Sequence, residues 1–246
     1  MLGTNIFKLE NLHLTNTSLC SQRETKSRQS FTVAVEGNIG SGKSTFLDHF
    51  KSNPNVEIFP EPVEKWKSVK GFNSLDLMYK DAARWSFAFQ SYVTLTMIEH
   101  HQAIETPGKV KMIERSIYSA RHCFIENLSR GGLMPAVDYN ILLEWHDWIH
   151  KNADTHIDLI VYLKARPEIC QERIRIRNRH EEQSVPLEYL QTLHSLHEEW
   201  LIEKKAGELP APVLVINAEV DETDLKKTIS KLEPQILCGI SSNQTS

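Results

Sequence analysis

The chain has 246 residues, of which 40% are hydrophobic and 24% charged, as is usual for a globular protein with one α/β domain or two small ones. Its net charge of −4 at pH 7 excludes a strongly basic nucleic-acid-binding protein, so an anionic substrate needs a local cluster of positive charge. No apolar run in the sequence approaches the length that spans a bilayer.

The first residues are rich in Ser, Thr and Asn and show no hydrophobic periodicity, so we expect a disordered leader over 1–30. A mitochondrial transit peptide is usually rich in Arg and poor in acidic residues. Here Lys8 and Arg23 are the only Lys or Arg residues before position 24, and Glu10 and Glu24 are acidic. The expected location is therefore cytoplasmic, with a mitochondrial location kept as the alternative.

The hydrophobic run FTVAVE predicts a buried strand over 31–36, and a helix is expected over 42–51. Between them, the segment from Gly37 to Ser44 matches the pattern G-x-x-x-x-G-K-[ST] at every fixed position. Its glycines let the backbone curl tightly and present N–H groups to phosphate oxygens, and the start of the helix adds positive charge. Lys43 can then contact the β- and γ-phosphates, while Ser44 binds Mg²⁺. The residues expected to bind ATP here are Gly37, Asn38, Ile39, Gly40, Ser41, Gly42, Lys43, Ser44 and Thr45.

The alternative interpretation of this motif is a glycine-rich turn that starts a helix and binds nothing. A chance match in a chain of this length has odds on the order of one in a hundred, and the flanking strand and helix also fit a phosphate-binding loop. GTPases, ATPases and small-molecule kinases share the motif, so it does not name the reaction by itself. The sequence contains no N-K-x-D motif for guanine, which argues against a GTPase.

A short strand is expected over 56–60, and Glu61 follows it. Pro62 disfavours the helical conformation of the residue before it, so Glu61 should end the strand in an extended conformation. It would then lie at the carboxyl edge of the sheet, where open α/β folds bind ligands. A carboxylate at this edge can accept the proton of an attacking hydroxyl group. The alternative is an ordinary surface glutamate in a turn.

Helical periodicity continues over 75–105, where two helices are expected, and a strand follows over 110–113. Glu114 and Arg115 come directly after this strand, at the same edge of the sheet as Glu61. Glu114 can hold Mg²⁺ directly or through water, and Arg115 can neutralise oxygens near the reacting centre. The alternative is a structural ion pair at the start of the next helix.

The rest of the chain continues the alternation, with helices expected over 116–130, 137–150, 167–180 and 187–204 and strands over 157–163 and 213–216. Short apolar strands that alternate with helices favour a parallel sheet covered on both faces. We expect a single domain over 31–233, followed by a loose tail over 234–246. The four cysteines form no CxxC pair, so we expect free thiols rather than a zinc site or a disulfide framework.

A cluster of arginines belongs to the helix expected over 167–180, which begins with a proline in its first turn. Arg173 and Arg177 are four residues apart on one helix face, and Arg179 follows them. Such a cluster can close over a triphosphate and stabilise the charge of the transferred group. The alternative is a solvated basic face balanced by nearby glutamates. In a chain with a phosphate-binding loop and no other positive clamp, we favour the clamp.

Six segments, taken in order, resemble the deoxynucleoside kinase family, and they are VEGNIGSGKST, EPVEKW, LMYKDAARWSFAFQSYVTLTM, ERSIYSARHCFIENL, DLIVYL and RIRIRNRHEEQSVPLEYL. The resemblance covers about residues 31–217 and is nearest to the branch with mitochondrial thymidine kinase and the insect multisubstrate deoxynucleoside kinases. It implies a P-loop kinase fold, with a five-stranded parallel sheet flanked by helices and an arginine-rich lid. It also implies a homodimer that transfers phosphate from ATP, with Mg²⁺, to the 5′-hydroxyl of deoxynucleosides in nucleotide salvage.

The resemblance also implies roles for single residues. Glu61 would be the general base for the 5′-hydroxyl, with Arg115 and Lys43 as its catalytic partners. Ser44 and Glu114 would hold Mg²⁺. The pocket for the nucleoside would be formed by Glu61, Trp66, Tyr79, Phe89, Gln90, Val93, Met97, Arg115, Phe124, Leu128 and Glu182. The lid over ATP would contain Arg173, Arg177 and Arg179.

Within the implied pocket, Gln90 would hydrogen-bond the base and Phe124 would stack on it, while Tyr79 and Glu182 would bind the sugar 3′-hydroxyl. An amide side chain carries both a donor and an acceptor, so it can match thymine or, when flipped, cytosine. This tolerance favours pyrimidine nucleosides such as thymidine and deoxycytidine, without ranking them.

Two other functions stay open on the sequence. A kinase for nucleoside monophosphates would need additional positive charge around the acceptor, whereas the implied pocket is aromatic, apolar and lined by an amide. A non-catalytic nucleotide-binding module would lack either the general base or the arginine clamp, and both are present as candidates.

Overall fold

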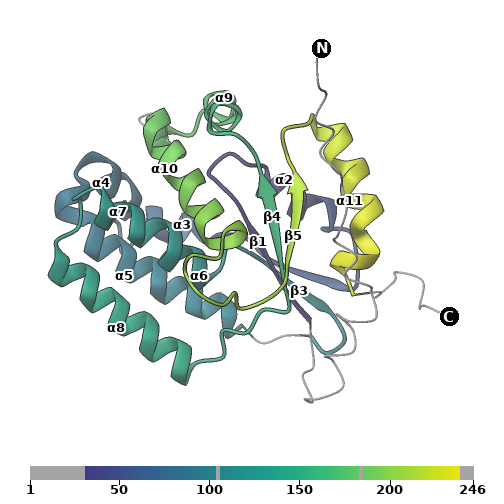
Figure 1. The fold of residues 1–246 in the computed structure, drawn as a ribbon, viewed down its shortest axis with the longest axis horizontal. Helices are drawn as coiled ribbons and strands as arrows, with labels where there is room; N and C mark the ends of the chain where they lie inside the picture. The colour runs from purple at the N-terminus through teal and green to yellow at the C-terminus, as the bar shows by residue number, and fades with distance from the viewer. Residues whose placement is uncertain (1–30, 104–105, 183–184, 239–246) are drawn as a thin grey trace, which may run out of the picture.

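The computed structural model describes residues 31–103, 106–182 and 185–238, so the leader expected over 1–30 lies outside the described residues. Within the described part, five parallel strands form one sheet in the order β2-β3-β1-β4-β5 (Figure 1). The strands are β1 (Phe31–Glu36), β2 (Val56–Phe59), β3 (Val110–Glu114), β4 (Leu159–Lys164) and β5 (Val213–Asn217). The expectation of a five-stranded parallel sheet flanked by helices is confirmed.

Strand β1 lies at the centre of the sheet, and all six of its residues are buried. Val33 pairs with Met112 of β3 on one side and with Leu159 of β4 on the other. A strand that is covered on both faces needs an unbroken apolar run rather than an alternating one, which explains the sequence FTVAVE. The carboxyl ends of β1, β2 and β3 therefore come together at one edge.

Alternate residues of the central strands pack on opposite faces of the sheet, because successive side chains of a strand point in opposite directions. Val33, Val35 and Val161 belong to a cluster that also contains residues of α2 (Lys43–His49) and α11 (Glu222–Ile236). The residues between them pack instead with α10 (Leu187–His197) and the π-helical turn η4 (Glu198–Ile202), in a cluster that includes Ala34, Ile160, Tyr162, Leu193, Leu196 and Trp200. Figure 1 shows α11 and α10 on opposite sides of the sheet.

A second group of helices extends away from the sheet and includes the long helices α5 (Ala82–His101) and α8 (Ala136–Asn152), which lie side by side (Figure 1). The shorter members are α3 (Val63–Lys67), α4 (Ser74–Lys80), α6 (Ile117–Ser119), the π-helical turn η2 (Ala120–Ile125) and α7 (Glu126–Arg130). Asn73 and Asp81 start α4 and α5, since their side-chain oxygens accept hydrogen bonds from the N–H groups of Asp76 and Arg84.

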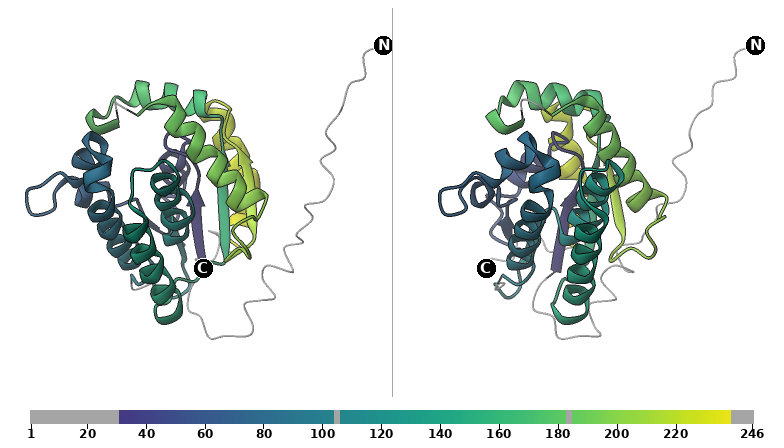
Figure 2. Two further views of the ribbon diagram at one scale, coloured as in Figure 1. Left: turned by 60° about the vertical axis from the view of Figure 1, so that its left-hand side comes forward. Right: turned by 90° about the vertical axis from the view of Figure 1, so that its left-hand side faces the viewer.

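The segment that carries the arginine cluster follows β4 and consists of α9 (Pro167–Arg177) and the 3₁₀ turn η3 (His180–Glu182). Turn η3 contacts α4, so this segment bridges from the sheet to the outer group of helices, as Figure 2 shows. Asn178 ends α9 in the left-handed conformation, with φ of 53°, which asparagine tolerates better than most residues.

The structure corrects three expectations about elements. The helices expected over 116–130 and 187–204 contain the π-helical turns η2 and η4, which a helical periodicity in the sequence does not by itself predict. Residues 234–238 of the tail expected over 234–246 are packed, because α11 continues to Ile236, and Ile236, Leu237 and Cys238 are buried; the rest of that tail lies outside the described residues. Cys123 and Cys170 are buried free thiols as expected, whereas Cys238 is disulfide-bonded.

None of the helices in the described segments combines the length and the apolar character that a membrane crossing requires.

Candidate active site

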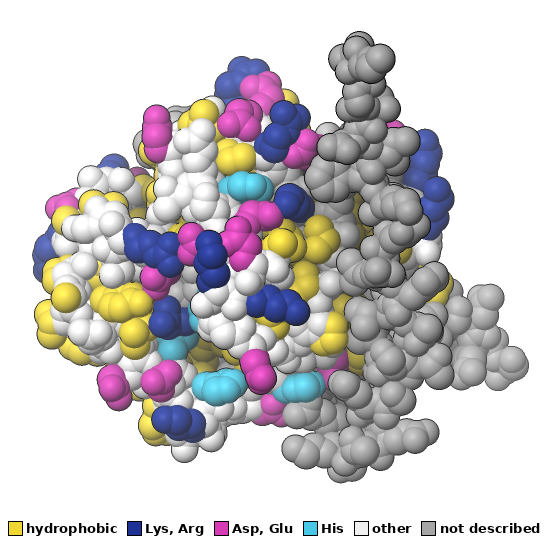
Figure 3. All heavy atoms as spheres, in the orientation of Figure 1, with side chains coloured by type: hydrophobic (Ala, Val, Ile, Leu, Met, Phe, Trp, Pro, Cys, Tyr) yellow, Lys and Arg dark blue, Asp and Glu magenta, His cyan; other side chains and the backbone are white. Residues whose placement is uncertain are grey.

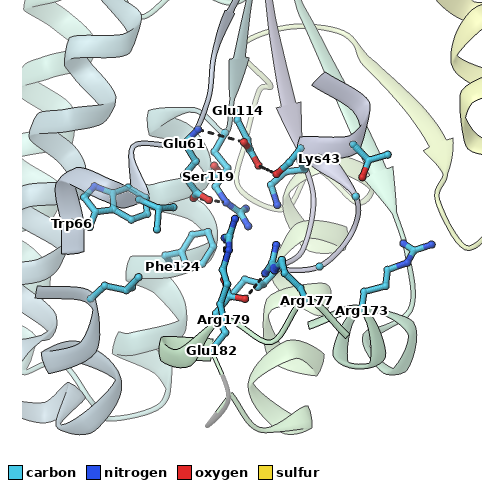
Figure 4. Close-up of a pocket in the computed structure, with 18 of the residues that line it drawn as sticks. Lys43, Glu61, Trp66, Glu114, Ser119, Phe124, Arg173, Arg177, Arg179 and Glu182 are labelled. Carbon is cyan, nitrogen blue, oxygen red and sulfur yellow. Dashed lines mark hydrogen bonds and ion pairs between the residues drawn. The ribbon is translucent and has the colours of Figure 1, made fainter. Parts of the chain in front are cut away.

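A cavity of about 520 Å³ opens at the carboxyl edge of the sheet, between the glycine-rich loop, the outer helices and the arginine segment (Figure 4). It brings together most of the residues that the sequence nominates. Those that line it are Ile39, Gly40, Gly42, Lys43, Ser44, Thr45, Glu61, Trp66, Tyr79, Phe89, Gln90, Val93, Met97, Glu114, Arg115, Phe124, Arg173, Arg177, Arg179 and Glu182. Segments 37–45, 61–97, 114–124 and 173–182 thus form one continuous site.

The glycine-rich loop holds a conformation that its sequence permits. Gly37 has φ of 144° and Gly40 has φ of 79°, in the region that side chains rarely adopt. A Cβ atom on Gly37 would lie 2.7 Å from the carbonyl oxygen of Leu163, and one on Gly40 would lie 2.5 Å from that of Cys170. Both glycines are therefore required by close backbone contacts. Gly37, Asn38 and Ser41 shape the loop without lining the cavity.

Lys43 is the first residue of α2 and is buried beneath the loop. Its Nζ atom donates to the carbonyl oxygens of Asn38, at 2.9 Å, and Gly37, at 3.3 Å. Burial, followed by repulsion from Arg115, lowers the pKa of Lys43 to about 8, while nearby carboxylates that include Glu61 act in the opposite sense. Lys43 and Glu61 line the same cavity.

Glu61 and Arg115 form an ion pair in which Arg115 Nε lies 2.8 Å from Glu61 Oε1. Arg115 is 3% exposed, and its Nη1 atom donates to the carbonyl oxygen of Gly37 at 2.8 Å. One guanidinium group therefore touches both the carboxylate that follows β2 and the start of the phosphate loop. Its plane also lies over the ring of Phe124, with 4.7 Å between Cζ and the ring centroid.

Glu114 connects the same elements through its two oxygens. Ser44 Oγ donates to Glu114 Oε1 at 3.1 Å, and the N–H of Glu61 donates to Glu114 Oε2 at 3.4 Å. A hydroxyl and a carboxylate side by side are oxygen ligands of the kind that Mg²⁺ prefers, and Mg²⁺ usually takes one or two protein ligands together with water and substrate phosphates. The residues present therefore fit that ion.

The other end of the cavity is apolar, with one amide group. Gln90 of α5 is 2% exposed, and its Oε1 atom has no hydrogen-bond partner among the described residues. Trp66 and Phe89 meet edge to face, with ring centroids 5.7 Å apart, and Trp66 Nε1 donates to Thr96 Oγ1. A planar ligand with its own donor and acceptor would satisfy the free amide oxygen, and the rings would cover its faces.

Two arginines of the arginine segment, which consists of α9 and η3, reach Glu182, and Glu182 is 9% exposed. Arg177 forms a short ion pair with one oxygen of Glu182, and Arg179 Nη1 lies 3.4 Å from the other (Figure 4). Arg173 behaves differently from the expected lid residue, since its guanidinium donates to the backbone carbonyls of Ala218, Val220 and Ser41 and points away from Arg177 in Figure 4. Its bonds tie α9 to the loop after β5.

Leu128 is the predicted pocket residue that the structure places elsewhere. It is 1% exposed and packs in a separate cluster with Ile125, Met134 and Leu142. Leu128 lies in α7, directly after the π-helical turn η2, and its side chain packs in this cluster, so the structure does not place it in the pocket that the resemblance implies.

Several residues that line the cavity were not predicted, among them Leu75, Met78, Ser116, Ser119, Ala120, Tyr189, Val220, Asp221, Glu222 and Leu225. Residues 220–225 follow β5, so the rule that ligands bind beyond the carboxyl ends of parallel strands could have indicated them. Ser119 and Tyr189 carry no such signal, because helical spacing alone does not separate pocket residues from core residues.

Comparison with known proteins gives a consistent result. The family model described as deoxynucleoside kinase matches residues 33–237. "Thymidine kinase 2, mitochondrial" of Homo sapiens is 50% identical over 197 residues, which cover 80% of this chain and 74% of that protein. The protein of the same name from Macaca fascicularis is 50% identical over 199 residues, covering 81% and 75%. "Deoxycytidine kinase" of Mus musculus is 36% identical over 227 residues, covering 80% and 87%.

Proposed function

This chain belongs to the deoxynucleoside kinase family, and from that premise we propose that it transfers the γ-phosphate of ATP to the 5′-hydroxyl of deoxynucleosides through the residues of the cavity described above. The products would be deoxynucleoside monophosphates, as in nucleotide salvage for DNA precursor synthesis. The observation that carries the assignment of roles is the ion pair between Glu61 and Arg115, 2.8 Å long, in the same cavity as Lys43.

In this proposal the glycine-rich loop and Lys43 hold the phosphates of ATP, and the 5′-hydroxyl lies beside Glu61. The carboxylate accepts the hydroxyl proton as the oxygen attacks the γ-phosphorus. The bond to the β-phosphate oxygen breaks, and ADP leaves with its electron pair. Arg115, Arg177 and Arg179 stabilise the negative charge of the moving group, so catalysis is mainly positioning and electrostatics.

Mg²⁺ would be held by Ser44 and Glu114, and when bound it supplies positive charge to the phosphate oxygens. The hydrogen bond between the Ser44 hydroxyl and the Glu114 carboxylate keeps the two oxygens side by side, which supports their assignment to one site.

The apolar end of the cavity would hold the nucleoside. Gln90 would pair with the edge of the base, Phe124 would stack on it, and Trp66 with Phe89, Val93 and Met97 would form the walls. Tyr79 and Glu182 would bind the 3′-hydroxyl, so Glu182 would exchange its arginine partners for the sugar when ATP draws the arginines toward its phosphates. The amide favours pyrimidines such as thymidine and deoxycytidine.

The experiment that tests this function is a phosphorylation assay with ATP, Mg²⁺ and each of the four deoxynucleosides, with ribonucleosides as controls. We expect deoxynucleoside monophosphates as products, pyrimidines as the better acceptors, and little product from ribonucleosides. Thymidylate offered as the acceptor tests the alternative of a nucleoside monophosphate kinase. Turnover of thymidylate without turnover of thymidine would contradict the proposal, and no turnover of any deoxynucleoside would support a non-catalytic module.

A homodimer is the assembly that the surface supports. Helix α8 exposes apolar side chains at spacings of four, four and three residues, which place them on one face, and these are Val137, Ile141, Trp145 and Trp148. Leu95 of the neighbouring helix α5 is 53% exposed. Figure 3 shows hydrophobic side chains gathered on this side of the molecule, at the left. An apolar face of this kind is typical of a contact between two copies of one chain.

The expected location is cytoplasmic, and the alternative is the mitochondrion that appears in the names of two relatives. Fractionation of cells that express the full chain with a C-terminal tag would separate the two locations.

A further inference from the structure

Arg115 has an unusual backbone for a residue with a long side chain. Its φ of 62° lies in the left-handed region, where residues other than glycine are strained. Such strain persists when the surrounding structure holds it in place, and it is concentrated at functional sites. The backbone N–H of Arg115 donates to the carbonyl oxygen of Val35 at 3.0 Å, so strand β1 holds one side of the turn.

Glu36, the next residue of β1, holds the other side. Its Oε1 atom accepts a hydrogen bond of 2.6 Å from Ser116 Oγ, and Ser116 directly follows Arg115. Glu36 is 0% exposed, and its Oε2 atom has no hydrogen-bond partner among the described residues. Val35 and Glu36, which are consecutive in β1, thus accept hydrogen bonds from Arg115 and Ser116, the two residues of the strained turn.

The buried carboxyl group of Glu36 is unfavourable for the stability of the fold. Burial of a carboxyl group is unfavourable, and it raises the pKa of Glu36 to about 7 even though the Ser116 hydrogen bond and the charge of Arg115 lower it. An apolar residue would fill the same place in the sheet without that cost. The Glu36 side chain accepts a hydrogen bond from Ser116, which directly follows Arg115, so the unfavourable burial of this carboxyl group stabilises the turn that carries Arg115.

We propose that Glu36 is a positioning residue for the phosphoryl transfer: by binding Ser116 it holds the left-handed turn that directs the Arg115 guanidinium to Glu61 and to the carbonyl oxygen of Gly37. The inference rests on the proposed role of Arg115 at the reacting hydroxyl. Glu36 itself does not touch the substrates, since it does not line the cavity. It acts through Arg115.

The test compares Glu36→Ala, Ser116→Ala and the double variant by steady-state kinetics with thymidine and ATP. We expect each single variant to lower kcat about tenfold, the effect of misplacing one charged group, while the KM for thymidine changes by less than about twofold. The double variant should lose no more than the worse single variant, because both substitutions remove the same hydrogen bond.

A conservative variant and a matched control separate positioning from loss of stability. Glu36→Gln keeps a side-chain oxygen that can accept from Ser116, so we expect kcat within about threefold of the native value. Ser86→Ala removes another buried hydroxyl. Ser86 lies on helix α5, and its hydroxyl donates to the carbonyl oxygen of Leu133 at 2.9 Å. We expect it to lower the melting temperature as Ser116→Ala does, with kcat unchanged.

Three results would overturn the proposal. One is native kcat in Glu36→Ala. Another is multiplication of the two single losses in the double variant, which would show that the residues act separately. The last is a loss in Glu36→Gln as large as in Glu36→Ala, because the hydrogen bond would then not be what matters. Arg115→Ala distinguishes this failure from that of the proposed function: if Arg115→Ala retains native kcat, the role of Arg115 itself is wrong.

Discussion

Three charged residues, Glu61, Arg115 and Lys43, lie together at the proposed reaction centre. Arg115 is nearly enclosed, whereas the Glu61 side chain is 19% exposed and lies on the cavity. The ion pair therefore fixes the direction of the carboxylate and leaves it accessible to a substrate. Lys43 is held by backbone carbonyls that phosphate oxygens would replace.

Glu61→Gln should keep the shape of the acceptor pocket and remove its base. We expect kcat for thymidine to fall by about 10²–10⁴-fold, the usual contribution of a general base. The Kd for thymidine, measured by calorimetry, should stay within about threefold, because the amide still offers an oxygen to Arg115. Native turnover in this variant would show that the base assignment is wrong.

Binding of ATP should take up protons at alkaline pH. The pKa of Lys43 is lowered to about 8 in the free protein, and phosphate beside the amine should raise it. Above pH 8, ATP binds the protonated form of an amine that is mostly neutral, so affinity should weaken by up to about tenfold per pH unit.

The measurement for this proton uptake is calorimetry of ATP binding at pH 8.5 in buffers that differ in ionisation enthalpy. Glu36→Gln serves as the control, because Glu36 also titrates close to this range, with a pKa raised by burial to about 7. Uptake of protons in both proteins supports the assignment to Lys43, and no uptake in either contradicts it.

Among the elements, helix α9 carries three arginines whose surroundings differ. Arg177 faces the cavity and pairs with Glu182, while Arg175 is exposed and pairs with Glu172 on its own helix. Arg173 bonds to backbone carbonyls of neighbouring segments. Of Arg175 and Arg177, only Arg177 lines the cavity, so it is the one that we expect to contact a phosphate.

Arg177→Ala should lower kcat/KM for ATP about a hundredfold, the effect of removing one group that stabilises transition-state charge. Arg175→Ala is the matched control, since it removes the same side chain two residues earlier, and we expect its kinetics to stay within about twofold of native. Equal losses in the two variants would indicate that the helix contributes only general positive charge.

The same elements show what could be predicted from sequence. The strands are predictable because each is a short apolar run, and Glu61 and Glu114 are predictable because each stands at the carboxyl end of such a run. In the structure Glu114 is the last residue of β3, and Glu61 lies two residues after the end of β2. Helix α11 was missed, since most of its residues are polar and Pro234 indicates an end rather than a last turn. The resemblance implies Leu128 as a pocket residue, but it packs in a separate cluster after a π-helical turn. The sequence predicts Glu36 only as a strand residue, because its hydrogen bond to Ser116 spans 80 residues and leaves no local pattern.

In the whole molecule, the cavity and the exposed apolar face of α8 lie on different sides. The cavity lies at the carboxyl edge of the sheet, whereas the exposed face of α8 belongs to the outer layer of helices (Figures 1 and 3). Assembly through α8 would bury this face and keep the cavity of each copy open.

Trp145→Glu combined with Trp148→Glu should separate the proposed dimer, because two buried charges would oppose association. Light scattering at micromolar concentration should give about twice the chain mass of 28.3 kDa for the native protein and the mass of one chain for the variant. Phe72→Glu changes another exposed aromatic residue, 70% exposed on the turn before α4, and should leave the mass unchanged. A native protein of one-chain mass would contradict the dimer.

The central claim is that Glu61 faces the terminal phosphate of a nucleotide held by residues 37–44. A crystal structure of the protein with thymidine, Mg²⁺ and a non-hydrolysable ATP analogue tests it directly. We expect the 5′-oxygen of thymidine within hydrogen-bond distance of the Glu61 carboxylate, about 2.6–3.2 Å, and the γ-phosphate in contact with Lys43. A 5′-oxygen bound to a different side chain, or a triphosphate away from Lys43, would contradict it.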